Sequence, residues 1–377
     1  MINTAYSIDS NNPIESFLTA RKNYIPGVTK IIHEDTDKNL KSASKYYENG
    51  FFNGDAYQTF ELYDTVQENN LYESFEYPRY WHGYLTILRP LLCLANYETI
   101  MFLSMLIFLS LLICVTILTY KKIGAFPAMA LILACVSVDL LVVVKSINEI
   151  LCFDLALIYS IFILIKKQKD NNISLAFFVF GSITNFLDLF TNPIVTYGIP
   201  IMIYFLVLLK DEKINLKKVL YIFFKTSISW VLGYALTWMS KWVITDVILN
   251  RNVIKNGIEQ VLFRSIVNSS DKNVNIKNFL ERIILFFSLD YIIILIGVIT
   301  LIIIFNIKKI KDVSKKSINK KVSIITYFIG ILIPVVWYIV LSQHSIIHLF
   351  FTYRNLIIFV FCIELITMEL LNATYKK

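Results

Sequence analysis

The stretch ETIMFLSMLIFLSLLICVTILTY at residues 98–120, followed directly by Lys121 and Lys122, decides the fold of this chain. As an α-helix, it is long enough to cross the roughly 30 Å hydrocarbon core of a bilayer. Lysines that close an apolar run are typical of the cytosolic end of a spanning helix. The stretch therefore predicts a membrane-spanning helix and makes an integral membrane protein the expected class.

The same pattern continues along the chain. Apolar runs that predict about nine spanning helices lie at 98–120, 124–144, 150–166, 173–190, 194–210, 219–239, 283–306, 322–341 and 355–371. Lysines gather in every second gap, at 121–122, 166–169, 210–218, 308–321 and 376–377. The positive-inside rule places these gaps in the cytosol. We therefore expect an all-α, polytopic helix bundle with a cytoplasmic C-terminus, and we expect residues 1–97 and the loop 240–282 outside.

Composition supports this class and excludes others. Hydrophobic residues make up 56% of the chain, and the mean hydropathy is +0.61, which is above the usual range of soluble domains. The net charge of +8 does not indicate nucleic-acid binding, because the gaps between spans explain the lysine excess. The five cysteines form no CxxC pair, so they predict neither a disulfide framework nor a zinc site.

The N-terminal part divides in two. Residues 1–76 are expected to form an extracytoplasmic segment of short helices, although no run in them is apolar enough for a signal peptide or anchor. Either a special route exports this segment or a preceding helix is missing from the sequence, and we expect the missing helix. Residues 77–97 join a Tyr/Trp cluster to an apolar stretch around Arg89 and Pro90, which predicts a helix in the headgroup plane. The helix bundle follows at 98–377.

Acidic residues in or beside spans are the first candidates for function, because an ionisable group in hydrocarbon is costly. Asp139, Asp154, Asp188 and Asp290 all map to the outer half of the membrane in the predicted topology. The alternative for each is a side chain that reaches water or pairs between helices.

The arginines and histidines give a second indication. All arginines map outside, at Arg21, Arg79, Arg89, Arg251, Arg264, Arg282 and Arg354. A guanidinium grips phosphate through two parallel hydrogen bonds, which favours a lipid-linked phosphate as ligand. The alternative is that a lysine-rich genome uses arginine sparingly. Two outside clusters, at 79–84 and 343–354, contain His82, His344 and His348. The last two share a helical face, but no third metal ligand is specified, so contact with phosphate or sugar hydroxyls is preferred.

Three stretches resemble one protein family. RYWHGYLTILRPLL (79–92), FLDLFTNP (186–193) and HSIIHLFFTYR (344–354) are similar to stretches of an uncharacterised family of multi-pass membrane proteins from Gram-positive bacteria. The resemblance covers most of the chain. It implies a location in the bacterial cytoplasmic membrane and a further N-terminal helix, and it carries over no catalytic residue.

The layout is also loosely similar to that of the GT-C membrane glycosyltransferases, an analogy of architecture. It implies that a carboxylate in the first external loop acts as base while a sugar leaves a polyprenyl-phosphate donor. Asp55 is the expected base, with Asp188 in reserve. The groups expected to stabilise the phosphate are Arg79, His82, Arg89, His344, His348 and Arg354. A divalent ion could assist, although nothing in the sequence requires one.

Two other functions are rivals. A transporter or lipid flippase would favour spans broken by Gly or Pro in corresponding halves, and no such halves are evident in the sequence. A non-catalytic scaffold of cell-envelope assembly would bind its partners through the outside loops. Membrane lipids are the expected partners in every case, and the sequence specifies no oligomeric state.

Overall fold

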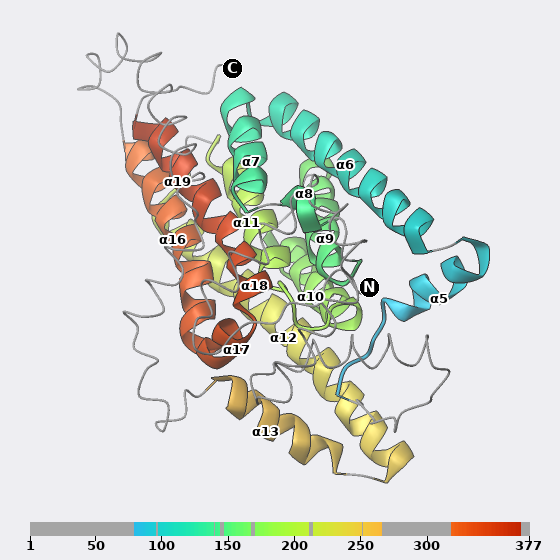
Figure 1. The fold of residues 1–377 in the computed structure, drawn as a ribbon. Helices are drawn as coiled ribbons and strands as arrows, with labels where there is room; N and C mark the ends of the chain where they lie inside the picture. The colour runs from blue at the N-terminus through green and yellow to red at the C-terminus, as the bar shows by residue number, and fades with distance from the viewer. Residues whose placement is uncertain are drawn as a thin grey trace, which may run out of the picture. The chain divides into compact units, whose positions relative to one another are not determined.

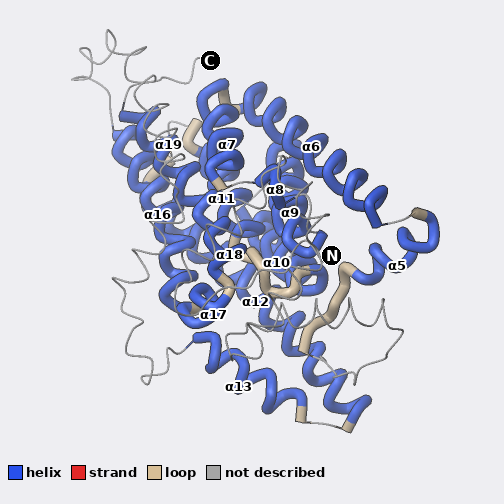
Figure 2. The backbone as a smooth tube through the Cα atoms, viewed as in Figure 1, coloured by secondary structure: helices blue, strands red, loops and turns tan. Residues whose placement is uncertain are grey.

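The structure is a computed structural model that describes residues 79–95, 97–138, 140–143, 147–166, 170–210, 214–250, 252–265 and 318–370. These residues belong to one compact unit. They form helices joined by turns, with no strand in the described part (Figure 2), so the predicted all-α class is confirmed there. The predicted segment 1–76 with Asp55, the predicted span 283–306, and Asp139 and Asp290 lie outside the described residues.

The described chain contains thirteen α-helices and one 3-10 helix (Figure 1). In chain order they are α5 (Leu85–Leu94), α6 (Tyr97–Lys122), α7 (Ala125–Ser137), α8 (Leu140–Val143), α9 (Ile147–Ile165), α10 (Asp170–Leu187), α11 (Val195–Leu208), α12 (Leu216–Leu249), α13 (Val253–Ser265), α16 (Ile318–Val340), α17 (Ser342–Ile347), α18 (Leu349–Thr352), η3 (Tyr353–Leu356) and α19 (Ile357–Leu370).

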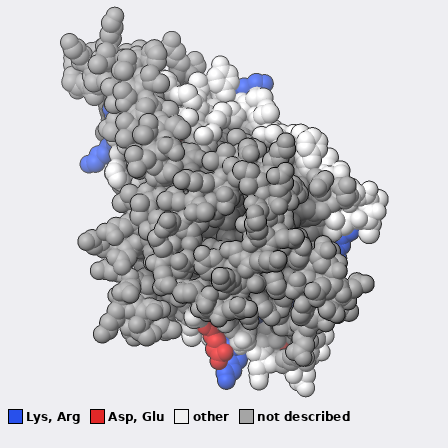
Figure 3. All heavy atoms as spheres, viewed as in Figure 1, with Lys and Arg blue, Asp and Glu red and all other residues white. Residues whose placement is uncertain are grey.

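Three helices are long and apolar enough to cross a membrane. They are the segments Thr99–Lys122 of α6, Leu216–Ile248 of α12 and Lys320–Val340 of α16. Each presents large apolar side chains outward, among them Phe102, Phe224 and Ile339. On the face drawn in Figure 3, most visible atoms of the described residues carry no charge. Apolar surface of this extent fits contact with lipid rather than with water.

Two helix boundaries differ from the sequence prediction. The predicted span 124–144 is interrupted at Val138, which leaves helical geometry directly after Ser137. The Ser137 hydroxyl donates to the Ala134 carbonyl at 2.8 Å, a local bond that competes with the helix. The predicted span 219–239 continues to Leu249, so the first ten residues assigned to the loop 240–282 are helical instead. This helix ends at Asn250, whose left-handed conformation (φ 50°, ψ 49°) closes helices commonly.

Helices α10 and α12 pack backbone to backbone. A Cβ atom on Gly233 would lie 2.0 Å from the Phe178 carbonyl oxygen, and one on Gly181 would lie 2.2 Å from the Trp230 carbonyl oxygen. The Ser182 hydroxyl donates across this contact to the Gly233 carbonyl at 3.2 Å. Small residues permit such close approach between apolar helices, and here they fix the position of the end of α10.

The lysines of two gaps meet at one end of the helices, named here the lysine end. Lys122, the last residue of α6, donates through Nζ to the Leu164 carbonyl near the end of α9. Lys210, which follows α11, donates to the Lys122 carbonyl at 2.6 Å. Lysines complement helix C-termini in this way because they neutralise unpaired carbonyl groups. Helices α6, α9 and α11 therefore end together.

Candidate functional site

A buried turn between α10 and α11, residues 188–193, forms the centre of the candidate site. The Asp188 carboxylate accepts a hydrogen bond from the Thr191 hydroxyl at 2.6 Å and from the Thr191 backbone N–H at 3.0 Å. Asp188 is only 1% exposed and Thr191 7%. An aspartate that binds the backbone three residues ahead closes a turn locally, and this contact positions Phe190 between them.

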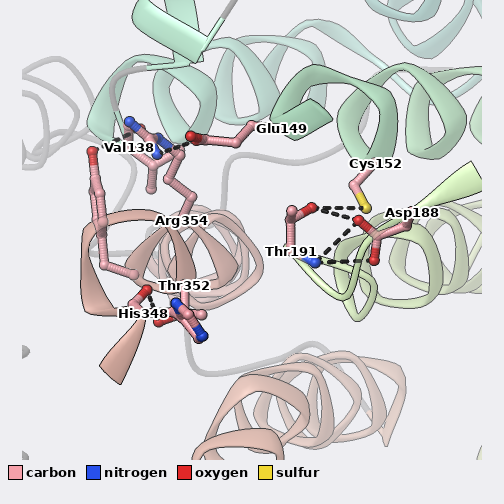
Figure 4. Close-up of polar contacts among 9 residues, drawn as sticks. Val138, Glu149, Cys152, Asp188, Thr191, His348, Thr352 and Arg354 are labelled. Carbon is pink, nitrogen blue, oxygen red and sulfur yellow. Dashed lines mark hydrogen bonds and ion pairs between the residues drawn. The ribbon is translucent and has the colours of Figure 1, made fainter. Parts of the chain in front are cut away.

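The first two turns of α9 connect this centre to η3. The Cys152 thiol lies 3.7 Å from the Thr191 hydroxyl. One helical turn earlier, Glu149 forms an ion pair of 2.7 Å with Arg354. Figure 4 shows both contacts. The turn 188–193, the start of α9 and η3 therefore meet at the end of the bundle away from the lysine end, which is named here the arginine end.

The segment 79–84 docks onto the same end. The Gly83 N–H donates to the Phe186 carbonyl at 2.9 Å, and a Cβ on Gly83 would lie 2.3 Å from that oxygen. The Arg79 carbonyl accepts from the indole N–H of Trp238 at 2.9 Å and from that of Trp242 at 3.1 Å. The Arg79 side chain donates to Asn256 of α13 at 2.8 Å. The guanidinium of Arg79 therefore faces α13.

Phe190 joins the three stretches that the sequence singles out. Its ring centroid lies 5.4 Å from that of Trp238 and 4.6 Å from that of His344. Trp238 in turn stacks on Tyr80 at 5.6 Å. His344 lies 4.8 Å from His348 between ring centroids. The clusters 79–84, 186–193 and 343–354 are thus brought together, although more than 100 residues separate the first from the second and more than 140 separate the second from the third.

Two residues of this region have strained backbones. His82 has φ 52° and Phe190 has φ 67°, values that are uncommon outside glycine. Strain of this kind costs about 1–3 kcal/mol and persists where surrounding contacts enforce it, often at functional sites. Here the Gly83–Phe186 bond and the ring contacts of Phe190 enforce it.

Burial sets the charge of the ionisable groups in the turns at the arginine end. It lowers the pKa of His348 to about 4, with a smaller contribution from the charge of Arg264. Burial also places the pKa of His344 well below its ordinary value. Both histidines are therefore neutral at pH 7, and each can serve as a hydrogen-bond donor rather than as a cation.

Because His348 is neutral in the folded protein, we expect the folded protein to lose stability in acid. Between pH 6.5 and 4 the unfolded chain binds a proton at this residue and the folded chain does not, so stability falls as the pH falls. We expect a loss on the order of 2 kcal/mol from His348 between pH 6.5 and 4.5. Thermal unfolding in detergent measures this loss, and the variant His348→Gln should show a shallower decline. An equal decline in both proteins would contradict the assignment.

The remaining predicted site residues are Arg89, Asp55 and Arg354. Arg89 is exposed on α5, and Asp55 lies outside the described residues. The Arg354 charge is already balanced by Glu149. Within the described ranges, no group of three or more His, Cys, Asp or Glu side chains could hold a metal ion.

The sequence analysis did not single out three residues of this region, of which Asn185 and Asn192 are buried and Glu149 is partly buried. Glu149, in a predicted outside turn, pairs with Arg354. Asn185 and Asn192 are 2% and 0% exposed, and they flank Asp188 in the sequence. The sequence did contain a signal for the two asparagines, because their carboxamides lie in an apolar run close to Asp188.

Comparison with protein-family models, with curated proteins and with solved structures returned no match. The class that the fold defines is therefore an all-helical protein with helices suited to a membrane.

Proposed function

We propose that this chain is a polytopic protein of the bacterial cytoplasmic membrane, with about nine spanning helices and the lysine end in the cytosol. We further propose that its arginine end transfers a sugar from a polyprenyl-phosphate donor outside the membrane, in the manner of GT-C glycosyltransferases. The convergence of the clusters 79–84, 186–193 and 343–354 on Phe190 carries this proposal. Helix α5 supports it, because Ile87, Leu92 and Leu94 are exposed apolar residues suited to the headgroup plane.

In the proposed reaction, a carboxylate takes the proton of an acceptor hydroxyl while that oxygen attacks the anomeric carbon. The bond between the anomeric carbon and the phosphate oxygen breaks, and the lipid phosphate leaves with the electron pair. We assign the base to Asp55, because both oxygens of the reserve candidate Asp188 are engaged by Thr191.

The charge on the leaving phosphate requires donors placed beforehand. Arg79 and Arg89 are the proposed cations, since Arg354 is paired with Glu149. His82, His344 and His348 are proposed to contribute N–H groups. The neutral state of His344 and His348 fits this role.

Arg79→Ala and Arg89→Ala are each expected to reduce sugar transfer by roughly 100-fold. The measurement is transfer from a polyprenyl-phosphate sugar in isolated membranes, normalised to the amount of folded protein. Lys255→Ala, which removes an exposed cation of α13, is the matched control and should leave transfer unchanged. Normal transfer in both arginine variants would refute the enzymatic proposal.

A further inference from the structure

The turn 188–193 and the neighbouring helices α10 and α12 contain buried polar side chains whose hydrogen-bonding capacity is not used. Asp188, Asn185 and Asn192 are 1%, 2% and 0% exposed. The amide oxygen and nitrogen of both asparagines, and the hydroxyl of Tyr234, have no hydrogen-bond partner among the described residues. A buried polar group without a partner costs free energy and requires an explanation. Several such groups beside a carboxylate indicate a polar ligand.

These groups come from α10, from α12 and from the turn between α10 and α11. The Asp188 N–H donates to the Thr184 carbonyl at 2.8 Å, which continues the helical hydrogen-bond pattern of α10. Asn185 and Asp188 are therefore one turn apart on one helical face. The ring of Tyr234 of α12 lies 6.3 Å, centroid to centroid, from the ring of Phe190 in the turn. Asn192 directly follows Thr191, which binds the Asp188 carboxylate.

The charges around Asp188 indicate whether the ligand is a cation or an anion. Asp188 forms no ion pair with a Lys, Arg or His of the described part of the chain, and both of its carboxylate oxygens accept hydrogen bonds from Thr191. The nearby Arg354 is paired with Glu149. The carboxylate also follows the C-terminus of α10, which is the negative end of the helix dipole. A negative group among neutral oxygens suits a hard cation, and a single carboxylate balances a single positive charge.

We propose that the turn 188–193 binds a monovalent metal cation such as Na⁺. The Asp188 carboxylate is the charged ligand, and the side-chain oxygens of Asn185, Asn192 and Tyr234 are neutral ligands. Water that accompanies the ion accepts from the amide N–H groups. The cation stabilises the turn that positions Phe190. This inference goes beyond sugar transfer and holds whether or not the protein is an enzyme.

The test uses the purified protein in detergent. Thermal unfolding is measured between 1 and 300 mM NaCl, with choline chloride keeping the ionic strength constant. Wild-type protein should gain at least roughly 3 °C in melting temperature as NaCl replaces choline. Binding of radioactive ²²Na⁺ to wild-type protein measures the site directly and does not depend on any variant folding.

The variants Asp188→Asn and Asn192→Ala should each lose most of the sodium-dependent gain. Asn172→Ala, at an exposed position on the same helix, should keep it. The proposal is overturned if NaCl and choline chloride give the same melting temperature, if only Mg²⁺ or Ca²⁺ raises it, or if Asp188→Asn retains the full gain. Loss of sugar transfer in Arg79→Ala bears on the proposed enzyme alone, so the two proposals fail separately.

Discussion

Glu149→Ala is expected to destabilise the protein by about 3 kcal/mol. The side chain of its partner Arg354 is only 9% exposed, so the variant leaves a guanidinium buried without its carboxylate. Removing one member of a largely buried ion pair is costly for this reason. The measurement is thermal unfolding in detergent, where we expect the melting temperature to fall by roughly 5–10 °C.

Two companion variants separate charge from packing. Glu259→Ala removes an exposed glutamate of α13 and should change stability by less than about 0.5 kcal/mol. The double variant Glu149→Leu with Arg354→Leu removes both charges and should recover most of the loss, because apolar replacements of a buried pair are often neutral. A single Glu149→Ala variant as stable as wild type would show that the pair contributes little.

Gly233→Ala is expected to be destabilising by roughly 2 kcal/mol. In an exposed helix position the same change would stabilise by about 1 kcal/mol, since alanine has the higher helix propensity. Here the added methyl would lie 2.0 Å from the Phe178 carbonyl oxygen, and a backbone atom cannot move without shifting α10. The unfolding temperature of the purified variant checks the sign of the effect.

Gly330→Ala is the matched control for this clash. Its added methyl would meet the sulfur atoms of Cys362 and Met202, at 2.4 and 2.6 Å. Side chains can rotate where a carbonyl cannot, particularly the flexible thioether of methionine. We therefore expect a smaller loss for Gly330→Ala than for Gly233→Ala. The reverse order would contradict the backbone explanation of the α10–α12 contact.

The positions of the helices were largely predictable from the sequence. The predicted span 98–120 falls within α6, and the predicted span 322–341 matches α16 to within one residue at its end. Apolar run length locates such helices because hydrocarbon requires continuous apolar surface. The end of α12 was missed since Trp242, Val243 and Ile244 continue the apolar run past Lys241. Run length also does not show which helices touch.

The candidate site was predictable only in outline. The histidine and arginine clusters drew attention to stretches that the structure brings together at Phe190. The pairing of Glu149 with Arg354 joins residues 205 apart in sequence, and nothing local specifies such a partner. The strained backbone of Phe190 likewise depends on rings from other helices, so no local propensity indicates it.

The length of α12 has a consequence for the whole bundle. Its 34 residues make a rod of about 51 Å, and outward apolar side chains continue from Tyr221 to Ile248. A rod of this length stays within roughly 30 Å of hydrocarbon only by leaning away from the membrane normal. A thicker bilayer would let it stand more upright. Because α10 is locked to it through Gly233, bilayer thickness would then be transmitted mechanically to the turn that holds Asp188.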